Sequence, residues 1–347
     1  MSLSSIRRRA CVLAALASFG TMLLGCSPEA PAPAAAPASA PAPAPAPAPA
    51  AQSKAVSVVS IVEHPALDAI RDGVKEELEA AGYTGDKLKW QYQSAQGNTG
   101  TAAQIARKYI GEKPDAIVAI ATPSAQAVVA ATKDIPVVYS GVTDPVAAQL
   151  VPSWEASGTN VTGVSDMLPL DGQADLIRRI VPTAKRVGMV YNPGEANSVV
   201  VVDEFKRILP AKGMELVEAA APRTVDIPSA VRSLAGKVDV MYTNTDNNVV
   251  SAYESLAKIA GELKIPLVAA DTDSVKRGAV AALGQDYRGI GRQTGRIVVR
   301  ILEGEKPGAI PSETGKVLDL TINAKAAEAQ GVTLSEELLK EAKEVLR

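Results

Sequence analysis

A series of strand and helix patterns occurs twice in this chain, in the same order. Residues 54–82 and 185–213 align without a gap, and each begins with Lys, passes through an apolar run and ends at Gly. The segment DAIVAIATPSAQAVVAA has its counterpart in DVMYTNTDNNVVSAYES, and IPVVYSGVTDPV has its counterpart in IPLVAADTDSV. Two lobes of like topology account for this duplication.

Short apolar runs alternate with longer helical patterns throughout residues 55–347. Runs such as VSVVSIV, AIVAIA, RVGMVY and VDVMYT are typical of strands that are buried on both faces. Strands that alternate with helices indicate an α/β fold with parallel sheets. We therefore expect two doubly wound parallel-sheet lobes joined by a hinge.

The N-terminal part of the chain differs from this pattern. Residues 1–25 combine the basic run RRR with an apolar stretch and a small residue, as a secretory signal peptide does. The sequence LLGC resembles the bacterial lipobox, in which the cysteine, here Cys26, carries a lipid anchor; the alternative is ordinary cleavage nearby. Residues 26–54 are rich in Ala and Pro and predict an extended spacer of about 3.1 Å per residue. A proline-rich peptide ligand is the alternative role for the spacer.

Composition and motifs exclude several functions. The formal net charge of −2 gives no reason to expect a nucleic-acid partner. Cys11 and Cys26 both precede the α/β region, which leaves no thiol there for a disulfide, a zinc site or a nucleophile. The first strand is followed by EHPALDA rather than a glycine-rich turn, and the P-loop, nucleophile-elbow and zinc-protease motifs do not occur. We expect no enzyme activity, no metal and no cofactor.

Polar turns that follow the strands are the candidate ligand-binding segments. In open α/β sheets, ligands bind beyond the carboxyl ends of the strands, beside helix N-termini. In the first lobe these turns supply Glu63, His64, Thr122, Ser124, Ala125, Thr143 and Asp144. In the second lobe they supply Asn192, Asp246, Asn247 and Asp271. We expect the two sets to face each other across a cleft.

These side chains suit an amino-acid ligand. Thr122 and Ser124 stand directly before a helix and suit a carboxylate, although either residue also serves as a helix cap. Asp271 is the preferred partner of an ammonium group; its alternative is a capping role. Asp144 precedes a proline, where an aspartate more often serves a turn, and a lone histidine such as His64 more often has a structural role. The turns contain no Arg for a phosphate, and the body has few aromatic rings to stack on a sugar.

The segments EHPALDAIRDG, TPSAQA, VTDPVAA, NVTGVSD, YNPGEANS, AADTDSVKRGA and GRQTG together resemble the substrate-binding proteins of ABC importers in the tryptophan/tyrosine-type group. The resemblance covers residues 55 to about 332 and implies a type I periplasmic-binding-protein fold. It implies a first lobe of residues 55–162 and 286–311 and a second of residues 163–285 and 312–347. The chain then crosses between the lobes near residues 160–165, 283–287 and 311–316.

The same resemblance implies a small ligand, an amino acid of which the side chain is suggested to be aromatic. It also implies an ABC permease and its ATPase as partners, and a protein exported and anchored through lipid to the cell envelope membrane. A lipoprotein that presents a bound small molecule to a membrane receptor is the alternative function. The sequence alone does not separate these two uses of one fold.

Overall fold

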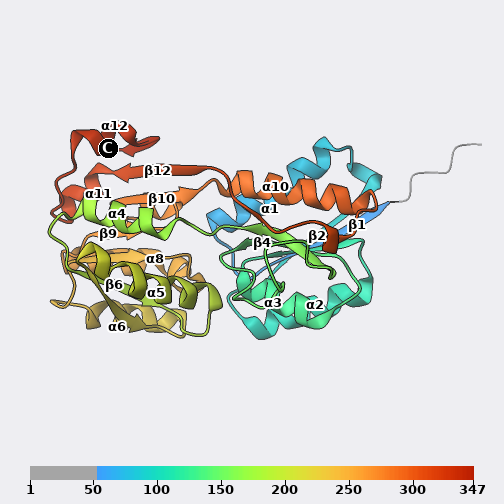
Figure 1. Cartoon of the computed structure of the whole chain (residues 1–347), viewed down its shortest axis with the longest axis horizontal. Coiled ribbons are helices and arrows are strands. Elements are labelled where there is room, and N and C mark those ends of the chain that lie inside the picture. Colours follow the sequence, from blue (N-terminus) through green and yellow to red (C-terminus); the bar gives the residue numbers. More distant parts are fainter. Residues whose placement is uncertain (1–52) are drawn as a thin grey trace, which may run out of the picture. The chain divides into compact units, whose positions relative to one another are not determined.

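Residues 53–347 are described by the computed structural model, and they form two α/β lobes with one sheet each (Figure 1). The predicted signal peptide (residues 1–25), Cys26 and nearly all of the predicted spacer (residues 26–54) lie outside the described residues. Within residues 53–347, none of the helices combines the length and the apolar character needed to cross a bilayer.

The first sheet is parallel throughout, with the strand order β11-β5-β4-β3-β1-β2. Its strands are β1 (Lys54–Ser60), β2 (Leu88–Ser94), β3 (Ala116–Ile120), β4 (Val137–Val142), β5 (Val161–Ser165) and β11 (Glu313–Thr314). Its helices are α1 (Pro65–Ala80), α2 (Thr99–Glu112), α3 (Thr122–Ala131) and α10 (Tyr287–Leu302). In Figure 1, α1 and α10 cover one face of this sheet and α2 and α3 cover the other. The central strands β3 and β4 are buried along their whole length, as their β-branched sequences predict.

The second sheet has the strand order β13-β12-β10-β9-β8-β6-β7. Its strands are β6 (Arg186–Tyr191), β7 (Glu215–Ala220), β8 (Val240–Thr243), β9 (Leu267–Ala269), β10 (Ala281–Gln285), β12 (Leu318–Asn323) and β13 (Glu344–Leu346). Its helices are α4 (Leu170–Ile180), α5 (Ala196–Ile208), α6 (Ile227–Ser233), α7 (Asn247–Ser251), α8 (Tyr253–Glu262), α9 (Asp273–Lys276), α11 (Ala324–Ala329) and α12 (Glu336–Glu341). Short 3-10 segments occur at η1 (Gly85–Lys87), η2 (Pro210–Lys212), η3 (Thr224–Asp226) and η4 (Pro307–Ala309).

The duplication and the two-lobed α/β fold predicted from the sequence are confirmed. The order β2-β1-β3-β4-β5 in the first sheet has its equivalent in β7-β6-β8-β9-β10 in the second. One pair departs from the parallel pattern, because β12 runs antiparallel to β10. The chain leaves β10 for the first lobe and returns beside the end of that strand, where Asp286 N–H donates to the Val317 carbonyl at 3.0 Å. A strand that enters at this edge must run in the opposite direction.

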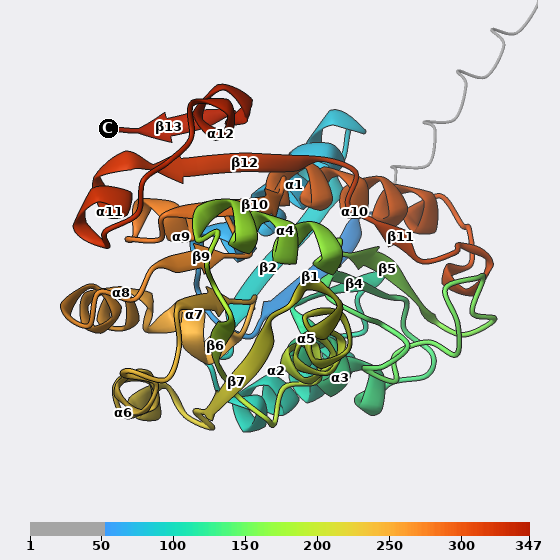
Figure 2. The same cartoon turned by 60° about the vertical axis from the view of Figure 1, so that its left-hand side comes forward.

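Three chain crossings join the lobes: after β5, between β10 and α10, and between β11 and β12. The first crossing falls after Ser165, because β5 pairs with β4 up to that residue. Figure 2 shows β11 beside β5, and their pairing keeps Glu313 and Thr314 in the first sheet. The lobe limits expected at single residues remain a prediction.

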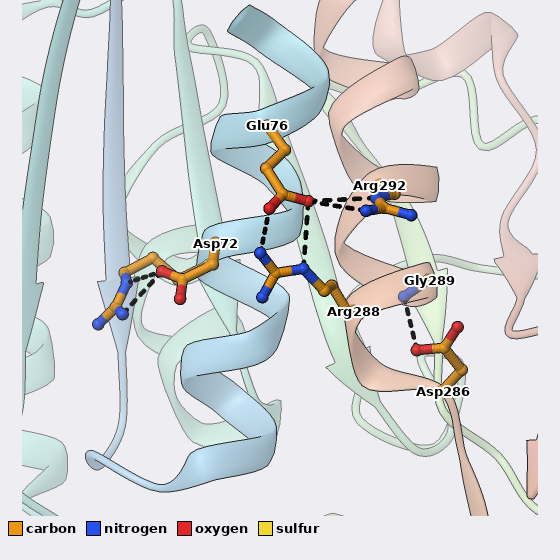
Figure 3. A network of polar contacts seen from close by, with 7 residues as sticks. Asp72, Glu76, Asp286, Arg288, Gly289 and Arg292 are labelled. Atoms are coloured by element: carbon orange, nitrogen blue, oxygen red, sulfur yellow. Dashed lines mark hydrogen bonds and ion pairs between the residues drawn. The ribbon is translucent and has the colours of Figure 1, made fainter. Parts of the chain in front are cut away.

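Helix α10 is held closely against α1 directly after the second crossing. A Cβ atom at Gly291 would overlap the Ile70 carbonyl oxygen, so only glycine permits this approach. On the outer side, Glu76 of α1 accepts hydrogen bonds from Arg288 and Arg292 of α10, and Asp286 caps α10 by accepting from Gly289 N–H at 3.0 Å (Figure 3). These contacts fix the start of α10, and with it the second crossing, to the first lobe.

Candidate functional site

A cavity with about 390 Å³ of empty space lies between the two lobes. Helices α3 and α5 contact each other across the cleft, so the cavity is bounded by both lobes. Its walls come from the turns after β1, β3, β4, β5, β6, β8 and β9 and from the starts of α7 and α10: His64, Ala66, Leu67, Ala121, Thr122, Gly141, Thr143, Asp166, Asn197, Thr245, Asn247, Val250, Asp271 and Tyr287.

Five of the residues singled out from the sequence border this cavity: His64, Thr122, Thr143, Asn247 and Asp271. They come from both lobes, and the expected meeting of the two polar edges is therefore seen for these five. The parallel strands of each lobe all end at the cleft, so the turns that follow them converge there.

The other predicted residues lie near the cavity without bordering it. Ser124 and Ala125 are buried in the first turn of α3. Glu63 accepts a hydrogen bond from Gln96 at the surface, and Asp144 accepts from the backbone N–H groups of the two residues after Pro145. The turn alternative for Asp144 is therefore what the structure has.

Asn192 and Asp246 are the remaining two. Asn192 borders a separate groove, which is also lined by residues of both lobes. Asp246 is buried and caps α7, accepting from Val249 N–H at 3.0 Å. It also accepts from Asn192 N–H at 2.7 Å, which ties the turns after β6 and β8 together.

The first-lobe wall carries hydrogen-bond donors that are free to meet a ligand. Thr122 Oγ1 and His64 Nε2 border the cavity, are buried and find no hydrogen-bond partner among residues 53–347. Ser124 Oγ also has no partner there, but Ser124 does not border the cavity. His64 Nδ1 accepts from Ala66 N–H at 3.3 Å and caps α1, so a neutral ring carries its proton on Nε2. Burial lowers the pKa of His64, which keeps the ring neutral. The structural role of His64 and a donor role toward a ligand are thus compatible.

Backbone strain marks the same wall. Ala121, between β3 and α3, has φ 71° and ψ 154°, a conformation that is normally reserved for glycine. This turn places Thr122 at the start of α3, where backbone N–H groups and the helix dipole favour an anion.

Asp166 is the most conspicuous residue that sequence reasoning missed. It is buried, and its carboxylate accepts from Tyr287 O–H at 3.2 Å and from Thr143 O–H at 3.3 Å. It makes no ion pair with any residue in the described part of the chain, and burial raises the pKa of Asp166 to about 6. Its position directly after β5, at the end of NVTGVSD, was the available signal. The sequence analysis used that segment for the family resemblance and for a chain crossing, and not as a source of ligand-binding residues.

Asp271 combines two roles. Its carboxylate accepts from Ser274 N–H at 2.9 Å and from Ser274 O–H at 2.6 Å, which is the capping arrangement left open by the sequence. It nevertheless borders the cavity, and each carboxylate oxygen retains a second lone pair.

The second-lobe wall is organised by a buried carboxylate that the sequence did not single out. Glu195 accepts from Asn247 N–H at 3.1 Å and from the side-chain amides of Asn247 and Asn197 at 2.6 and 3.1 Å. Burial, and then the nearby charge of Asp246, raise the pKa of Glu195 to about 7. Glu195 therefore orients two amides that line the cavity. Asn197, Thr245 and Tyr287 were also missed, because a lone polar residue in a turn carries no distinctive pattern.

Metal ligands do not gather anywhere in residues 53–347, since no three His, Cys, Asp or Glu residues are arranged to hold an ion there. The cavity is instead bordered by hydroxyl, imidazole and amide donors together with the carboxylates of Asp166 and Asp271. Such an arrangement binds and orients a small polar molecule.

Residues 55–346 match the family model described as ABC transporter substrate binding protein. The chain therefore belongs to this family of substrate-binding proteins, and its lobes have the fold of type I periplasmic binding proteins. The family resemblance predicted from the sequence is confirmed.

Three individual proteins are similar to this chain over most of its length. The chain is 41% identical over 273 residues to the tyrosine-binding protein of Clostridioides difficile, covering 78% of this chain and 79% of that one. It is 34% identical to the ABC domain of Streptococcus pneumoniae solved in complex with L-Trp, with a TM-score of 0.82 over 85% of this chain and 100% of that one. It is 39% identical to a ligand-free, open substrate-binding protein with adhesive properties from Clostridium difficile, with a TM-score of 0.65 over 84% and 99% of the two chains. The structure thus resembles the L-Trp complex more than the open protein.

Proposed function

We propose that this protein binds an aromatic amino acid, tyrosine or tryptophan, between its lobes and delivers it to an ABC permease. The observation that carries the proposal is that one cavity is bordered by a buried Asp166, which has no cationic partner in residues 53–347, and by the unpaired donors of Thr122 and His64. A zwitterion satisfies both sets at once. The tyrosine-binding relative and the L-Trp complex support an aromatic side chain.

The ligand ammonium is assigned to the carboxylates that border the cavity. Asp166 is our first choice, because a desolvated carboxylate without a counter-ion gains most from a cation. Asp271 contributes from the second lobe, with Ser274 already holding it in place. Thr143 O–H fixes the Asp166 carboxylate and borders the same space.

The ligand carboxylate is assigned to the first-lobe wall. Thr122 O–H and His64 Nε2–H donate directly, and the N-terminus of α3 adds its dipole. Ser124 supports this turn. Ala125 N–H already bonds to the Ala121 carbonyl at 3.1 Å, so Ala125 acts only through the helix backbone.

The remaining predicted residues act around the site. Asn247 lines the second-lobe wall, where Glu195 orients it. Asp246 and Asn192 stabilise the turns, while Glu63 and Asp144 do so at the rim. None of these four is needed for direct contact with the ligand.

A thermal-unfolding screen with the twenty amino acids, followed by calorimetry on those that shift the transition, tests the proposal. A ligand at about 100 times its Kd adds ~2.7 kcal/mol to the free energy of unfolding. We expect tyrosine or tryptophan to shift the transition most, and acidic and basic amino acids to leave it unchanged. If none of the aromatic amino acids shifts the unfolding transition, the proposed function is refuted.

Delivery to a permease requires a separate test. The protein loaded with its ligand should stimulate the ATPase of its cognate permease complex reconstituted in vesicles, and the unloaded protein should not. Equal ATPase rates with and without ligand would favour the alternative in which the protein presents its ligand to a membrane receptor.

Anchoring to the membrane is part of the same proposal. We assign residues 1–25 to a signal peptide, Cys26 to lipid attachment and residues 26–54 to a spacer that holds the lobes away from an envelope membrane. The wild-type chain should incorporate a labelled fatty acid and sediment with membranes, and Cys26→Ser should do neither. Incorporation of the labelled fatty acid into the Cys26→Ser variant would contradict the assignment of Cys26.

A further inference from the structure

A second cavity adjoins the first. It holds about 230 Å³ of empty space and shares Thr143, Asp166 and Thr245 with the larger cavity, so the two are contiguous at the proposed ammonium site. Its walls are mainly apolar and come from Met167, Leu168, Leu170, Val201, Tyr242 and Ala270. Two residues with polar side-chain atoms, Tyr242 with its hydroxyl and Asn244 with its amide, border only this second cavity.

The orientation of the Asn244 amide is fixed by a chain of hydrogen bonds. Ser198 O–H donates to Asp246 at 2.6 Å, which uses the single proton of the hydroxyl. Ser198 Oγ then acts as an acceptor and takes the Asn244 amide N–H at 3.1 Å. The Asn244 amide oxygen therefore faces away from Ser198. It is buried, and no partner for it exists in residues 53–347.

The hydrogen bonds that Asp246 accepts set the direction of its bond with Ser198. Its two oxygens accept from Asn192 N–H at 2.7 Å and Val249 N–H at 3.0 Å. Backbone N–H groups only donate, so Asp246 is held as an acceptor and Ser198 as the donor to it. Asn244 cannot reverse its amide without breaking its bond to Ser198.

We propose that the second cavity receives the side chain of the ligand and that the Asn244 amide oxygen selects rings that carry a hydrogen-bond donor. The phenol O–H of tyrosine and the indole N–H of tryptophan satisfy this acceptor. Phenylalanine fills the same apolar walls and leaves it unpaired. The inference rests on the proposed function and adds the basis of its selectivity.

Selectivity among three amino acids measures the effect of Asn244. Calorimetry with tyrosine, tryptophan and phenylalanine on the wild-type protein should show phenylalanine binding about tenfold or more weakly than the better of the other two. Asn244→Leu removes the acceptor and keeps the wall apolar. It should lose most of this preference while phenylalanine binds as well as before or more tightly.

Asn248→Leu is the matched control. Asn248 lies four residues later, in the first turn of α7, but its amide donates to the Ala221 and Pro222 carbonyls and it borders neither cavity. This variant should keep the wild-type preference. Ser198→Ala leaves Asn244 in place and frees its amide to turn, so the preference should fall partly; this variant also serves if Asn244→Leu does not fold.

The outcomes separate the inference from the proposed function. If tyrosine or tryptophan binds but phenylalanine binds equally well, or if Asn244→Leu and Ser198→Ala both keep the preference, the role of Asn244 is refuted while the proposed function stands. If none of the three amino acids binds, the proposed function fails and the inference fails with it.

Discussion

Asp166 lies where the chain first leaves one lobe for the other, and it is buried beside two hydroxyl groups with no cation among residues 53–347. A carboxylate in this setting is costly to ionise and is a strong partner for an ammonium group. Asp271, which the sequence favoured as the ammonium partner, already accepts two hydrogen bonds from Ser274. In the proposed site, Asp166 at the first crossing is therefore the main partner of the ligand ammonium, and Asp271 in the turn after β9 is the second.

Asp166→Asn should weaken amino-acid binding by at least about tenfold at pH 8, since an amide gains far less than a carboxylate from an ammonium. Burial raises the pKa of Asp166 to about 6, so wild-type affinity should fall as the pH drops below this value. Calorimetry from pH 8 to pH 5 measures both effects. Asp166→Asn should flatten the pH profile, and Glu195→Gln separates any contribution from Glu195. A variant with the wild-type slope would contradict the assignment.

The same pKa has the opposite effect on the stability of the unliganded protein. The native pKa of Asp166 lies above the ordinary value of 3.8, so its contribution to stability is fully present below pH 3.8 and is lost as the pH rises through about 6. Thermal unfolding without ligand should show this contribution in wild type and not in Asp166→Asn.

Asp271→Ala should also weaken binding by at least about tenfold. Loss of its bonds to Ser274 should cost about 1 kcal/mol of stability, as the loss of a helix cap does. Ser274→Ala shares the lost cap bond but keeps the carboxylate. Binding reduced equally in both variants would mean that Asp271 acts only through the turn.

Ala121 stores strain at the proposed carboxylate site. Its φ of 71° with ψ of 154° suits glycine, so Ala121→Gly should raise the free energy of unfolding by about 1 kcal/mol after the entropic cost of glycine is subtracted. Chemical denaturation with and without ligand measures the change. A destabilised variant would show that neighbouring contacts fully compensate for the strain.

At the scale of the element, the contact between α1 and α10 positions the second crossing. The helices approach so closely at Gly291 that a methyl group would meet the Ile70 carbonyl. Glu76 then bonds to Arg288 and Arg292 across the outer edge, where solvent weakens the ion pair. Backbone proximity, rather than these exposed charges, accounts for most of the specificity of the contact.

Gly291→Ala should therefore destabilise the protein by about 1–3 kcal/mol, as overpacking does. Gly111, near the end of α2, has no heavy atom within 4 Å of an added Cβ and provides the control. Gly111→Ala should be neutral or stabilising by up to about 1 kcal/mol. Equal effects of the two substitutions would contradict the close approach.

At the scale of the whole body, residues 53–347, the cavity needs both lobes. The lobes are joined by three crossings and meet again at α3 and α5. Closure about the crossings should accompany binding, because residues from both lobes border the cavity in which we propose that the ligand binds. Small-angle scattering should show a smaller radius of gyration with saturating tyrosine or tryptophan. An unchanged profile would mean that the lobes keep one arrangement.

The sequence was sufficient for the fold because its signals are local and repeated. Runs such as AIVAIA predict strands buried on both faces, and the turn TPSAQ after one of them led to Thr122. His64, Thr143, Asn247 and Asp271 were found by the same rule, since the carboxyl ends of parallel strands face the ligand. The antiparallel β12 was missed, because its direction depends on where the chain re-enters the sheet.

The chain by itself determined two α/β lobes and the turns that face the cleft, since periodicity and strand-end polarity act over a few residues. Tertiary structure alone decided which polar groups lack a partner. Asp166 and Asn244 look like ordinary polar residues in the sequence, but in the folded protein both are buried, Asp166 without a cation and the Asn244 amide oxygen without a donor among residues 53–347. In the proposed function a ligand supplies the missing partners, and their absence depends on how the lobes pack.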